Sequence, residues 1–243
     1  MADLAGVITG AGSGIGRATA EKLLADGARV AAWDRDPDAL GRFADHPAAL
    51  GVTVDVTDPD QVAAAAERTR GAWGRVDFLV NSAGVFLVGP LGEVTPSAVR
   101  ALFDVNVVGT TLVTQALLPD LVAARGAIVN LSSTVGLRAT VSNSHYAASK
   151  AAIAHLTRCW ALELAGHGVR VNALAPGPTR TGIYAAAGMD QTAVDRLLTE
   201  RAGDIPLGRV GEPAEIALWI SRLLADEWVT GHVLPADGGM SIA

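Results

Sequence analysis

A glycine-rich turn near the N-terminus, between a short apolar run and a helical stretch, constrains the fold of this chain most strongly. Gly6–Thr9 is expected to be a strand and Arg17–Leu24 to lie in a helix. Glycines allow a tight turn and close approach of the backbone, and the free N–H groups at a helix start attract anions. The pattern predicts a sheet whose first strand leads into a pyrophosphate-binding turn, although Ile15 replaces the last glycine of the strict G-x-G-x-x-G spacing. The turn reads Thr9-Gly10-Ala11-Gly12-Ser13-Gly14-Ile15-Gly16.

Short apolar runs alternate with longer helical stretches along the whole chain. This alternation predicts an α/β fold, a parallel sheet with helices on both faces, in one domain that covers residues 1–243. The expected strands are Gly6–Thr9, Arg29–Trp33, Gly51–Val54, Val76–Asn81, Ala127–Ser132, Arg170–Ala173 and Gly231–Pro235. Helices are expected to begin near Gly14, Asp36, Asp58, Pro96, His145, Asp190 and Pro213.

Composition excludes several classes of protein. Half of the 243 residues are hydrophobic and 18% are charged, which is typical of a globular chain. The net charge of −6 argues against a nucleic-acid partner, because a phosphate backbone binds a dense basic stripe. A single cysteine and five scattered histidines predict no metal site. With no secretory leader pattern and no apolar run of membrane-spanning length, we expect a cytoplasmic protein with no membrane partner.

Asp34 follows the second expected strand, where a carboxylate can accept hydrogen bonds from an adenosine ribose. The same carboxylate would repel a 2′-phosphate, by roughly 1–4 kcal/mol for two unit charges about 4 Å apart. Arg35 is the contrary signal, because its guanidinium could attract that phosphate. The balance predicts NAD as the cofactor, with NADP less favoured.

Tyr146 and Lys150 are four residues apart in the helix expected to begin near His145, so their side chains share one face. A phenol has an ordinary pKa near 10 and is a poor base at neutral pH, whereas a neighbouring ammonium favours the phenolate. Bringing that pKa near 7 requires roughly 4 kcal/mol. The alternative to a catalytic role is a structural one, in which Tyr146 packs under the aliphatic stem of Lys150. Ser133 favours catalysis, because it lies at the carboxyl end of an expected strand, where α/β sheets bind ligands.

Asn106 is a further polar candidate. It lies inside the helix expected over Pro96–Leu118, although Asn is a mediocre helix former. It either bonds to the backbone, holds a water or is simply an exposed helical residue.

These motifs resemble those of the short-chain dehydrogenase/reductase family over nearly the whole chain. The resemblance implies a Rossmann-type doubly wound parallel sheet of about seven strands. It also implies hydride transfer between a nicotinamide and an alcohol/carbonyl pair, with Tyr146 as general acid/base and Asn106 holding a water in a proton relay. The family's catalytic Asn, Ser, Tyr and Lys match Asn106, Ser133, Tyr146 and Lys150, and its Asn-Asn-Ala-Gly stretch is similar to Asn81-Ser82-Ala83-Gly84.

The resemblance also implies a set of cofactor contacts and an oligomeric state. Ser13 stands where NADP-using members often carry a basic residue, which again favours NAD. A homotetramer is expected, with the helices Pro96–Ala123 and His145–Ala165 against a partner subunit. The implied cofactor-binding residues are Gly10, Ser13, Gly14, Ile15, Gly16, Asp34, Arg35, Asp55, Val56, Asn81, Ala83, Gly84, Tyr146, Lys150, Pro176, Gly177, Thr179 and Thr181.

The segment 178–208 is long for a connection and is expected to be a substrate-binding lid. Because its stretch Gly182–Met189 is small and apolar, we expect a small, mostly apolar secondary alcohol or ketone, that is, an alcohol dehydrogenase or ketoreductase activity. An NADPH-dependent 3-oxoacyl-[acyl-carrier-protein] reductase is an alternative, and a non-catalytic NAD sensor is an alternative of another class. The candidate substrate contacts are Ser133, His145, Tyr146, Ile183 and Tyr184.

Overall fold

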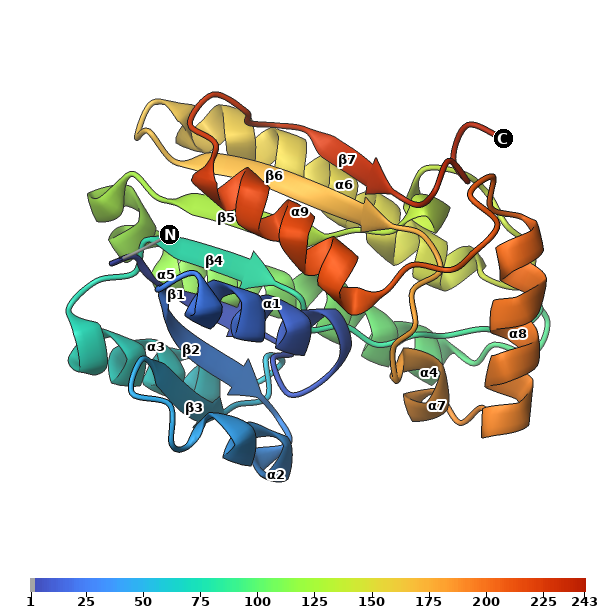
Figure 1. The fold of residues 1–243 in the computed structure, drawn as a ribbon, viewed down its shortest axis with the longest axis horizontal. Coiled ribbons are helices and arrows are strands. Elements are labelled where there is room, and N and C mark those ends of the chain that lie inside the picture. The colour runs from blue at the N-terminus through green and yellow to red at the C-terminus, as the bar shows by residue number, and fades with distance from the viewer. Residues whose placement is uncertain (1–2) are drawn as a thin grey trace.

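The computed structural model describes residues 3–243 and contains one seven-stranded sheet, in which every strand pair is parallel (Figure 1). Its order is β3-β2-β1-β4-β5-β6-β7, so the chain first builds outward from β1 and then crosses back to build the other half. The predicted single-domain Rossmann-type fold is confirmed. The strands are β1 (Ala5–Thr9), β2 (Arg29–Asp34), β3 (Ala49–Thr53), β4 (Phe78–Asn81), β5 (Ala127–Leu131), β6 (Arg170–Pro176) and β7 (Val233–Ala236).

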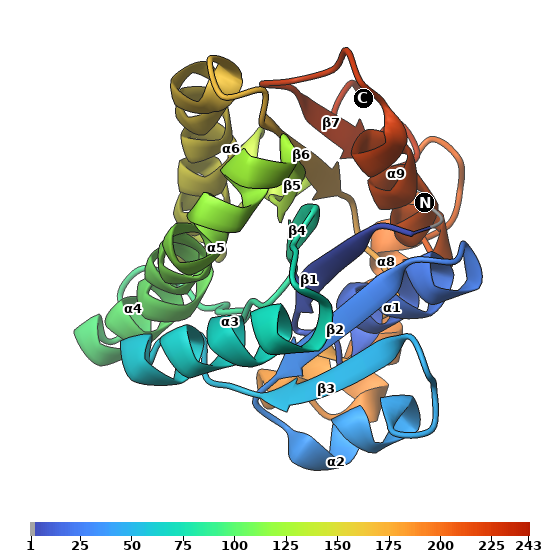
Figure 2. The same cartoon turned by 90° about the vertical axis from the view of Figure 1, so that its left-hand side faces the viewer.

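Helices cover both faces of the sheet, as Figure 2 shows in a view along it. One face carries α1 (Gly14–Ala25) and α9 (Pro213–Ala225), which pack against each other. The opposite face carries α3 (Pro59–Trp73), α5 (Thr110–Ala124) and α6 (Ser144–Ala165). The remaining helices are α2 (Pro37–Leu40), α4 (Pro96–Phe103), α7 (Ile183–Ala186) and α8 (Gln191–Gly203).

Two apolar layers, one on each face, hold these helices to the sheet. Successive side chains of a strand point to opposite faces. Val7 of β1 therefore packs with the layer under α3, α5 and α6, while Ile8 packs with the layer under α1 and α9. Both side chains are fully buried. Burial on both faces explains why the central strands are continuously apolar in the sequence.

The observed elements depart from the expected ones at three points. The helix expected near Asp36 ends after one turn as α2, and α7 has no counterpart among the expected helices. The single helix expected from Pro96 is interrupted by a π-helical turn, Asp104–Gly109, and then continues as α5. A π turn inserts one residue into the helical repeat and is frequent at functional sites. Asn106 lies in this turn and is 1% exposed, which excludes the exposed-residue alternative.

Asn81 lies inside the sheet rather than at its edge. Its side-chain amide donates to Asn130 Oδ1 at 2.8 Å and to Thr114 Oγ1 at 3.1 Å, and Asn130 in turn donates to Thr157. This buried chain of hydrogen bonds joins β4 and β5 to α5 and α6. These bonds give the Asn81 amide nitrogen a structural role, and contact between Asn81 and a cofactor stays a prediction.

One helical stretch, Pro96–Ala124, is long and apolar enough by length and composition to cross a membrane, although no apolar run of that length was expected from the sequence. In this fold the stretch packs against one face of the sheet. Val113, Leu117 and Leu121 on its inner face are fully buried against the sheet, which explains the apolar character of that face.

Candidate active site

Hydrogen bonds between the first and fourth strands form the floor of a cavity at the carboxyl edge of the sheet. Thr9 Oγ1, at the end of β1, accepts the backbone N–H groups of Ser82 and Ala83, both at 3.0 Å. The two strand ends are therefore held together where the strand order changes direction. Such a switch point is where open α/β sheets bind ligands. The cavity measures about 600 Å³.

The glycine-rich turn leaves no space for side chains on its inner side. Gly10 and Gly14 have φ angles of 65° and 52°, in the left-handed region that favours glycine. A Cβ on Gly16 would lie 2.2 Å from the carbonyl oxygen of Gly10. The turn thus folds tightly against the N-terminus of α1, whose first turn carries no acidic side chain. Free N–H groups and a partial positive charge there suit a pyrophosphate.

Two carboxylates border the cavity beyond this turn. Asp34 Oδ2 accepts the N–H of Gly12 at 2.8 Å, and its Oδ1 accepts that of Asp36 at 3.0 Å. Asp55 Oδ1 accepts from the backbone and hydroxyl of Thr57 at 2.9 and 2.8 Å. Each carboxylate oxygen has two lone pairs, so both acids keep acceptor capacity for a ligand. The glycine-rich turn, the N-terminus of α1 and these two acids together fit a dinucleotide. Its adenosine end would be held near the ends of β2 and β3.

Tyr146, Lys150 and Ser133 converge at the other end of the cavity. Tyr146 is 9% exposed and Lys150 6% exposed, although both are polar. Lys150 Nζ lies 5.7 Å from the centre of the Tyr146 ring and donates to the backbone oxygen of Leu131 at 2.9 Å. The Ser133 hydroxyl lies close enough to the Tyr146 phenol to lower its pKa, and it donates to the backbone oxygen of Pro176 at 3.5 Å. The spacing of four residues on α6 therefore brings phenol and ammonium to one face, as predicted from the sequence.

The pKa values run opposite to the electrostatic expectation. Burial raises the pKa of Tyr146 above its usual value, the nearby Tyr184 adds to this rise, and the Ser133 hydroxyl opposes it. Burial also lowers the pKa of Lys150 to about 8. Desolvation disfavours both charged forms, and here it exceeds the attraction between ammonium and phenolate. At neutral pH the Tyr146 phenol is therefore in its protonated form.

Asn106 is held by the chain itself. Its Oδ1 accepts the N–H of Val85 at 2.8 Å, and its Nδ2 donates to Val85 O and to Ser149 Oγ, both at 3.1 Å. A Cβ placed on Gly84 would lie 3.3 Å from Asn106 Oδ1 and 3.4 Å from Lys150 Nζ. Asn106 thus orients the segment that borders the lysine but does not itself line the cavity.

Most of the predicted site residues line one continuous cavity. Among the described residues, three predicted members are outside its wall: Asn81, Asn106 and His145. His145 is only partly buried and approaches Ser144 at the start of α6, which fits a surface position at the helix start. The predicted residues that do line it are Gly10, Ser13, Gly14, Ile15, Gly16, Asp34, Arg35, Asp55, Val56, Ala83, Gly84, Ser133, Tyr146, Lys150, Pro176, Gly177, Thr179, Thr181, Ile183 and Tyr184.

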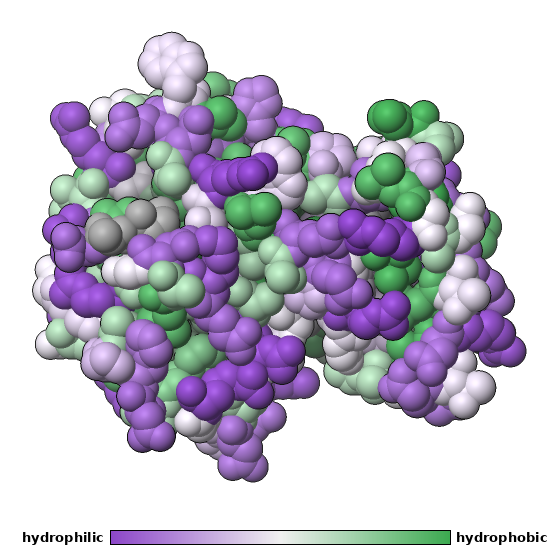
Figure 3. All heavy atoms as spheres, viewed as in Figure 1, coloured by the Kyte–Doolittle hydropathy of each residue, from purple (hydrophilic) through white to green (hydrophobic). Residues whose placement is uncertain are grey.

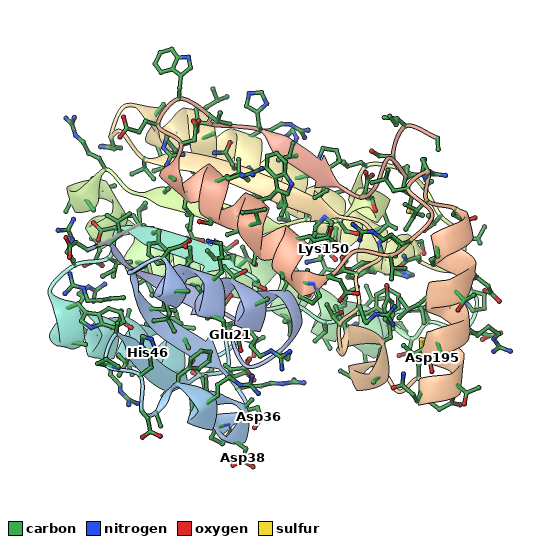
Figure 4. The ribbon with its side chains drawn as sticks, viewed as in Figure 1. Glu21, Asp36, Asp38, His46, Lys150 and Asp195 are labelled. Atoms are coloured by element: carbon green, nitrogen blue, oxygen red, sulfur yellow. The ribbon has the colours of Figure 1, made fainter. Side chains whose placement is uncertain are left out.

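The lobe formed by α7 and α8 borders the outer part of the cavity. In Figure 3 the surface is hollowed between this lobe and the main body of the molecule. Figure 4 labels Lys150 at the sheet edge that faces the lobe, and Asp195 on α8. A small core of its own packs this lobe, formed by Val194, Leu198, Ile205, Val210 and Met240. The predicted lid thus has a defined structure with two helices.

Several residues of the outer wall were not predicted from the sequence. Phe86 meets the rings of Tyr146 and Tyr184 edge to face, with centroids 4.9 and 5.3 Å away. Thr140 Oγ1 and Asn143 Oδ1 are buried without a hydrogen-bond partner, and both residues line the cavity. Arg201 of α8 also lines it. The polar run Ser142-Asn143-Ser144 just before Tyr146 is the sequence feature that could have indicated Asn143.

The fold and this site define an oxidoreductase that binds a nicotinamide dinucleotide. The chain belongs to the short-chain dehydrogenase/reductase family. A family model described as enoyl-(acyl carrier protein) reductase matches residues 10–241. The prediction from the sequence motifs is confirmed.

Named relatives span nearly the whole chain. It is 38% identical to a 3-oxoacyl-[acyl-carrier-protein] reductase of Thermotoga maritima, over 97% of both chains. It is 40% identical to human L-xylulose reductase, over 96% of this chain and 94% of the relative. The crystal structure of a Brucella melitensis 3-ketoacyl-(acyl-carrier-protein) reductase complexed with NADH superposes with a TM-score of 0.89 at 30% identity, covering 99% of each chain. These relatives differ in substrate, so the family alone does not define what this chain transforms.

The buried ammonium predicts a pH-dependent stability. Because the pKa of Lys150 falls from 10.5 to about 8 on folding, the unfolded chain binds more protons between these values, and stability should rise with pH there. Below pH 8 the burial of the charge destabilises the fold by roughly 3 kcal/mol. Lys150→Met removes the destabilisation caused by the buried charge, and it also removes a hydrogen bond that contributes about 1 kcal/mol. The cofactor-free variant should therefore be more stable than wild type at pH 7 by roughly 2 kcal/mol.

Urea unfolding of both proteins from pH 7 to pH 10.5 measures this difference. The advantage of Lys150→Met should shrink steadily above pH 8. A variant that is less stable at every pH, or a difference that does not change with pH, would show that the ammonium is not desolvated.

Proposed function

We propose that this protein is an NAD-dependent oxidoreductase that interconverts a small, mostly apolar secondary alcohol and its ketone. The observation that carries the proposal is the meeting of Tyr146, Ser133 and Lys150 in one cavity with a pyrophosphate turn. Its outer wall is aromatic and apolar, and it is lined by Phe86 and Tyr184. A bound nicotinamide supplies or accepts the hydride, and the chain supplies the proton chemistry.

Each catalytic side chain has a defined action at the substrate oxygen. The Tyr146 hydroxyl donates its proton to a ketone oxygen during reduction, and takes a proton from the alcohol during oxidation. The Ser133 hydroxyl, which lines the same cavity beside Tyr146, holds the same oxygen in place. Lys150 stabilises the phenolate left after proton transfer, because its ammonium lies over the ring. Asn106 positions Val85 and Gly84 beside the lysine.

The raised pKa of Tyr146 favours reduction at neutral pH. The protonated phenol is the form that reduction needs, whereas oxidation needs the phenolate. Groups facing the phenol are Ser133, Lys150 and Tyr184, and among them Lys150 carries the opposing charge. Because the phenolate fraction of Tyr146 grows with pH, alcohol oxidation should gain relative to ketone reduction as the pH rises.

NAD rather than NADP is supported by charge at the adenosine end. Asp34 borders the cavity, and Asp36 and Asp38 follow it (Figure 4). A 2′-phosphate there would meet the Asp34 carboxylate and the Arg35 guanidinium in the cavity wall, with two further acids next along the chain. The relative from Brucella melitensis was crystallised with NADH, which agrees with this choice.

A carrier-protein reductase is the second candidate, favoured by the 38% identity with the enzyme of Thermotoga maritima. Docking an acidic carrier needs a basic surface, whereas this chain carries a net charge of −6. The NAD sensor is disfavoured, because a protein without chemistry has no need for the retained Tyr146, Ser133 and Lys150.

We propose a homotetramer located in the cytoplasm. Exposed apolar side chains on two helices support assembly, since Leu162 of α6 is 82% exposed and Trp219 of α9 is 40% exposed. Sedimentation should give four times the 24.8 kDa of one chain, and Leu162→Asp should lower that mass. A monomeric wild-type protein would refute the assembly.

Tyr146→Phe tests the proton donor. Removing the hydroxyl should lower kcat for ketone reduction by a factor of about 10² to 10⁴, because general acid catalysis is lost. Binding of NADH, followed by its fluorescence, should remain close to that of wild type and serves as the folding control. Retention of most turnover would mean that another group transfers the proton.

Asp34→Ala tests the cofactor choice. Loss of the carboxylate removes a repulsion of roughly 1–4 kcal/mol, so the ratio of kcat/KM for NAD over NADP should fall by about tenfold or more. Initial rates with each cofactor measure the ratio. An unchanged ratio would contradict the electrostatic argument.

A further inference from the structure

A single positive charge stands on the outer wall of the cavity, among aromatic, apolar and uncharged polar side chains. The charged side chains that line the cavity, among the residues that the structure describes, are Asp34, Arg35, Asp55, Lys150 and Arg201. The first three belong to the adenosine end and Lys150 to the catalytic group. Of these charged residues, Arg201 is the one that belongs to α8, in the lobe that borders the outer part of the cavity.

The side chains of Phe86 and Tyr184 lie between Arg201 and the Tyr146 ring. Phe86 touches both Tyr146 and Tyr184, so the centres of the two tyrosine rings are no more than about 10 Å apart. The guanidinium of Arg201 lies close enough to Tyr184 to oppose the rise that burial causes in the pKa of that phenol. A ligand oxygen at Tyr146 and a second group at Arg201 would therefore be separated by an apolar body packed along Phe86 and Tyr184.

The charge of Arg201 is only weakly compensated. Its Nη1 lies 3.3 Å from Asp204 Oδ2, and the two side chains are 39% and 57% exposed. An exposed pair of this kind contributes about 0–1 kcal/mol and is easily exchanged. No carboxylate lines the outer wall among the described residues, so an anionic ligand would meet no repulsion there. A guanidinium matches the two oxygens of a carboxylate with parallel N–H donors.

We propose that Arg201 binds the carboxylate of the substrate, which is a hydroxy acid or oxo acid whose reacting carbon is separated from the carboxylate by an apolar chain or ring. This assignment rests on the function proposed above and narrows its substrate class. Binding to Arg201 places the ketone at Tyr146, while the apolar part fills the space between. Arg201 is thus a specificity-determining residue on the lid.

Matched substrates separate the charge from the rest of the ligand. We compare kcat/KM for NADH-dependent reduction of 6-oxoheptanoate with that of 6-oxoheptanamide, its neutral analogue of nearly equal size. Wild type should prefer the acid by about ten- to a hundredfold, because hydrogen bonds to charged groups are the stronger ones. Arg201→Met should abolish this preference, mainly through a higher KM for the acid. Arg201→Lys should restore part of it.

Arg196→Met is the matched control, because Arg196 is exposed on the same helix and does not line the cavity. It should keep the full preference for the acid. Equal reduction of acid and amide by wild type, or an equal loss in the Arg196 and Arg201 variants, would overturn the role of Arg201 while leaving the proposed function intact. No reduction of either compound, despite intact NADH binding, would refute the proposed function and this inference with it.

Discussion

Parallel pairing of all seven strands is the constraint on which the rest of this molecule depends. It places every carboxyl strand end at one edge, so residues far apart in the sequence meet there. Thr9 at the end of β1 bonds to Ser82 and Ala83 after β4, and Lys150 of α6 bonds to Leu131 at the end of β5. These contacts join backbone to side chain across the switch point of the sheet. The site is therefore held by the same hydrogen bonds that hold the strand ends together.

Burial of polar groups at that edge destabilises the ligand-free protein, and a ligand that bonds to these groups would offset the cost. Within residues 3–243, the Lys150 ammonium donates one hydrogen bond, to the backbone oxygen of Leu131, and burial lowers its pKa. Thr140 and Asn143 each keep a buried oxygen without a partner. An unsatisfied buried polar atom costs about 1–3 kcal/mol, so polar ligand groups that meet these atoms gain affinity. Such a balance is expected where a scaffold is built for binding rather than for stability alone.

Local patterns were sufficient to predict the sheet, most of its helices and the cofactor end of the cavity wall. The glycine turn and the spacing of Tyr146 and Lys150 depend on short-range geometry, which the sequence displays directly. The roles of Asn81 and Asn106 depend instead on which distant groups they meet, and both proved to be bonded to the chain itself. The pKa of Tyr146 was expected to fall and it rises, because the depth of burial cannot be read from spacing.

The same distinction separates catalysis from specificity in this structure. The sheet and α6 carry Tyr146, Ser133 and Lys150. The lobe formed by α7 and α8, which has its own small core, carries Tyr184 and Arg201. That core includes Met240, whose backbone oxygen accepts a hydrogen bond from Arg138, so the lobe is tied back to the main body near the C-terminus. Tyr184 of α7 still acts on the proton donor, because it adds to the raised pKa of Tyr146. Arg201 of α8 has no such contact with Tyr146, so a change there can alter which ligand binds while the proton donor stays as it is. Relatives with 38–40% identity to this chain carry the names of enzymes with different substrates, which agrees with a separation of this kind.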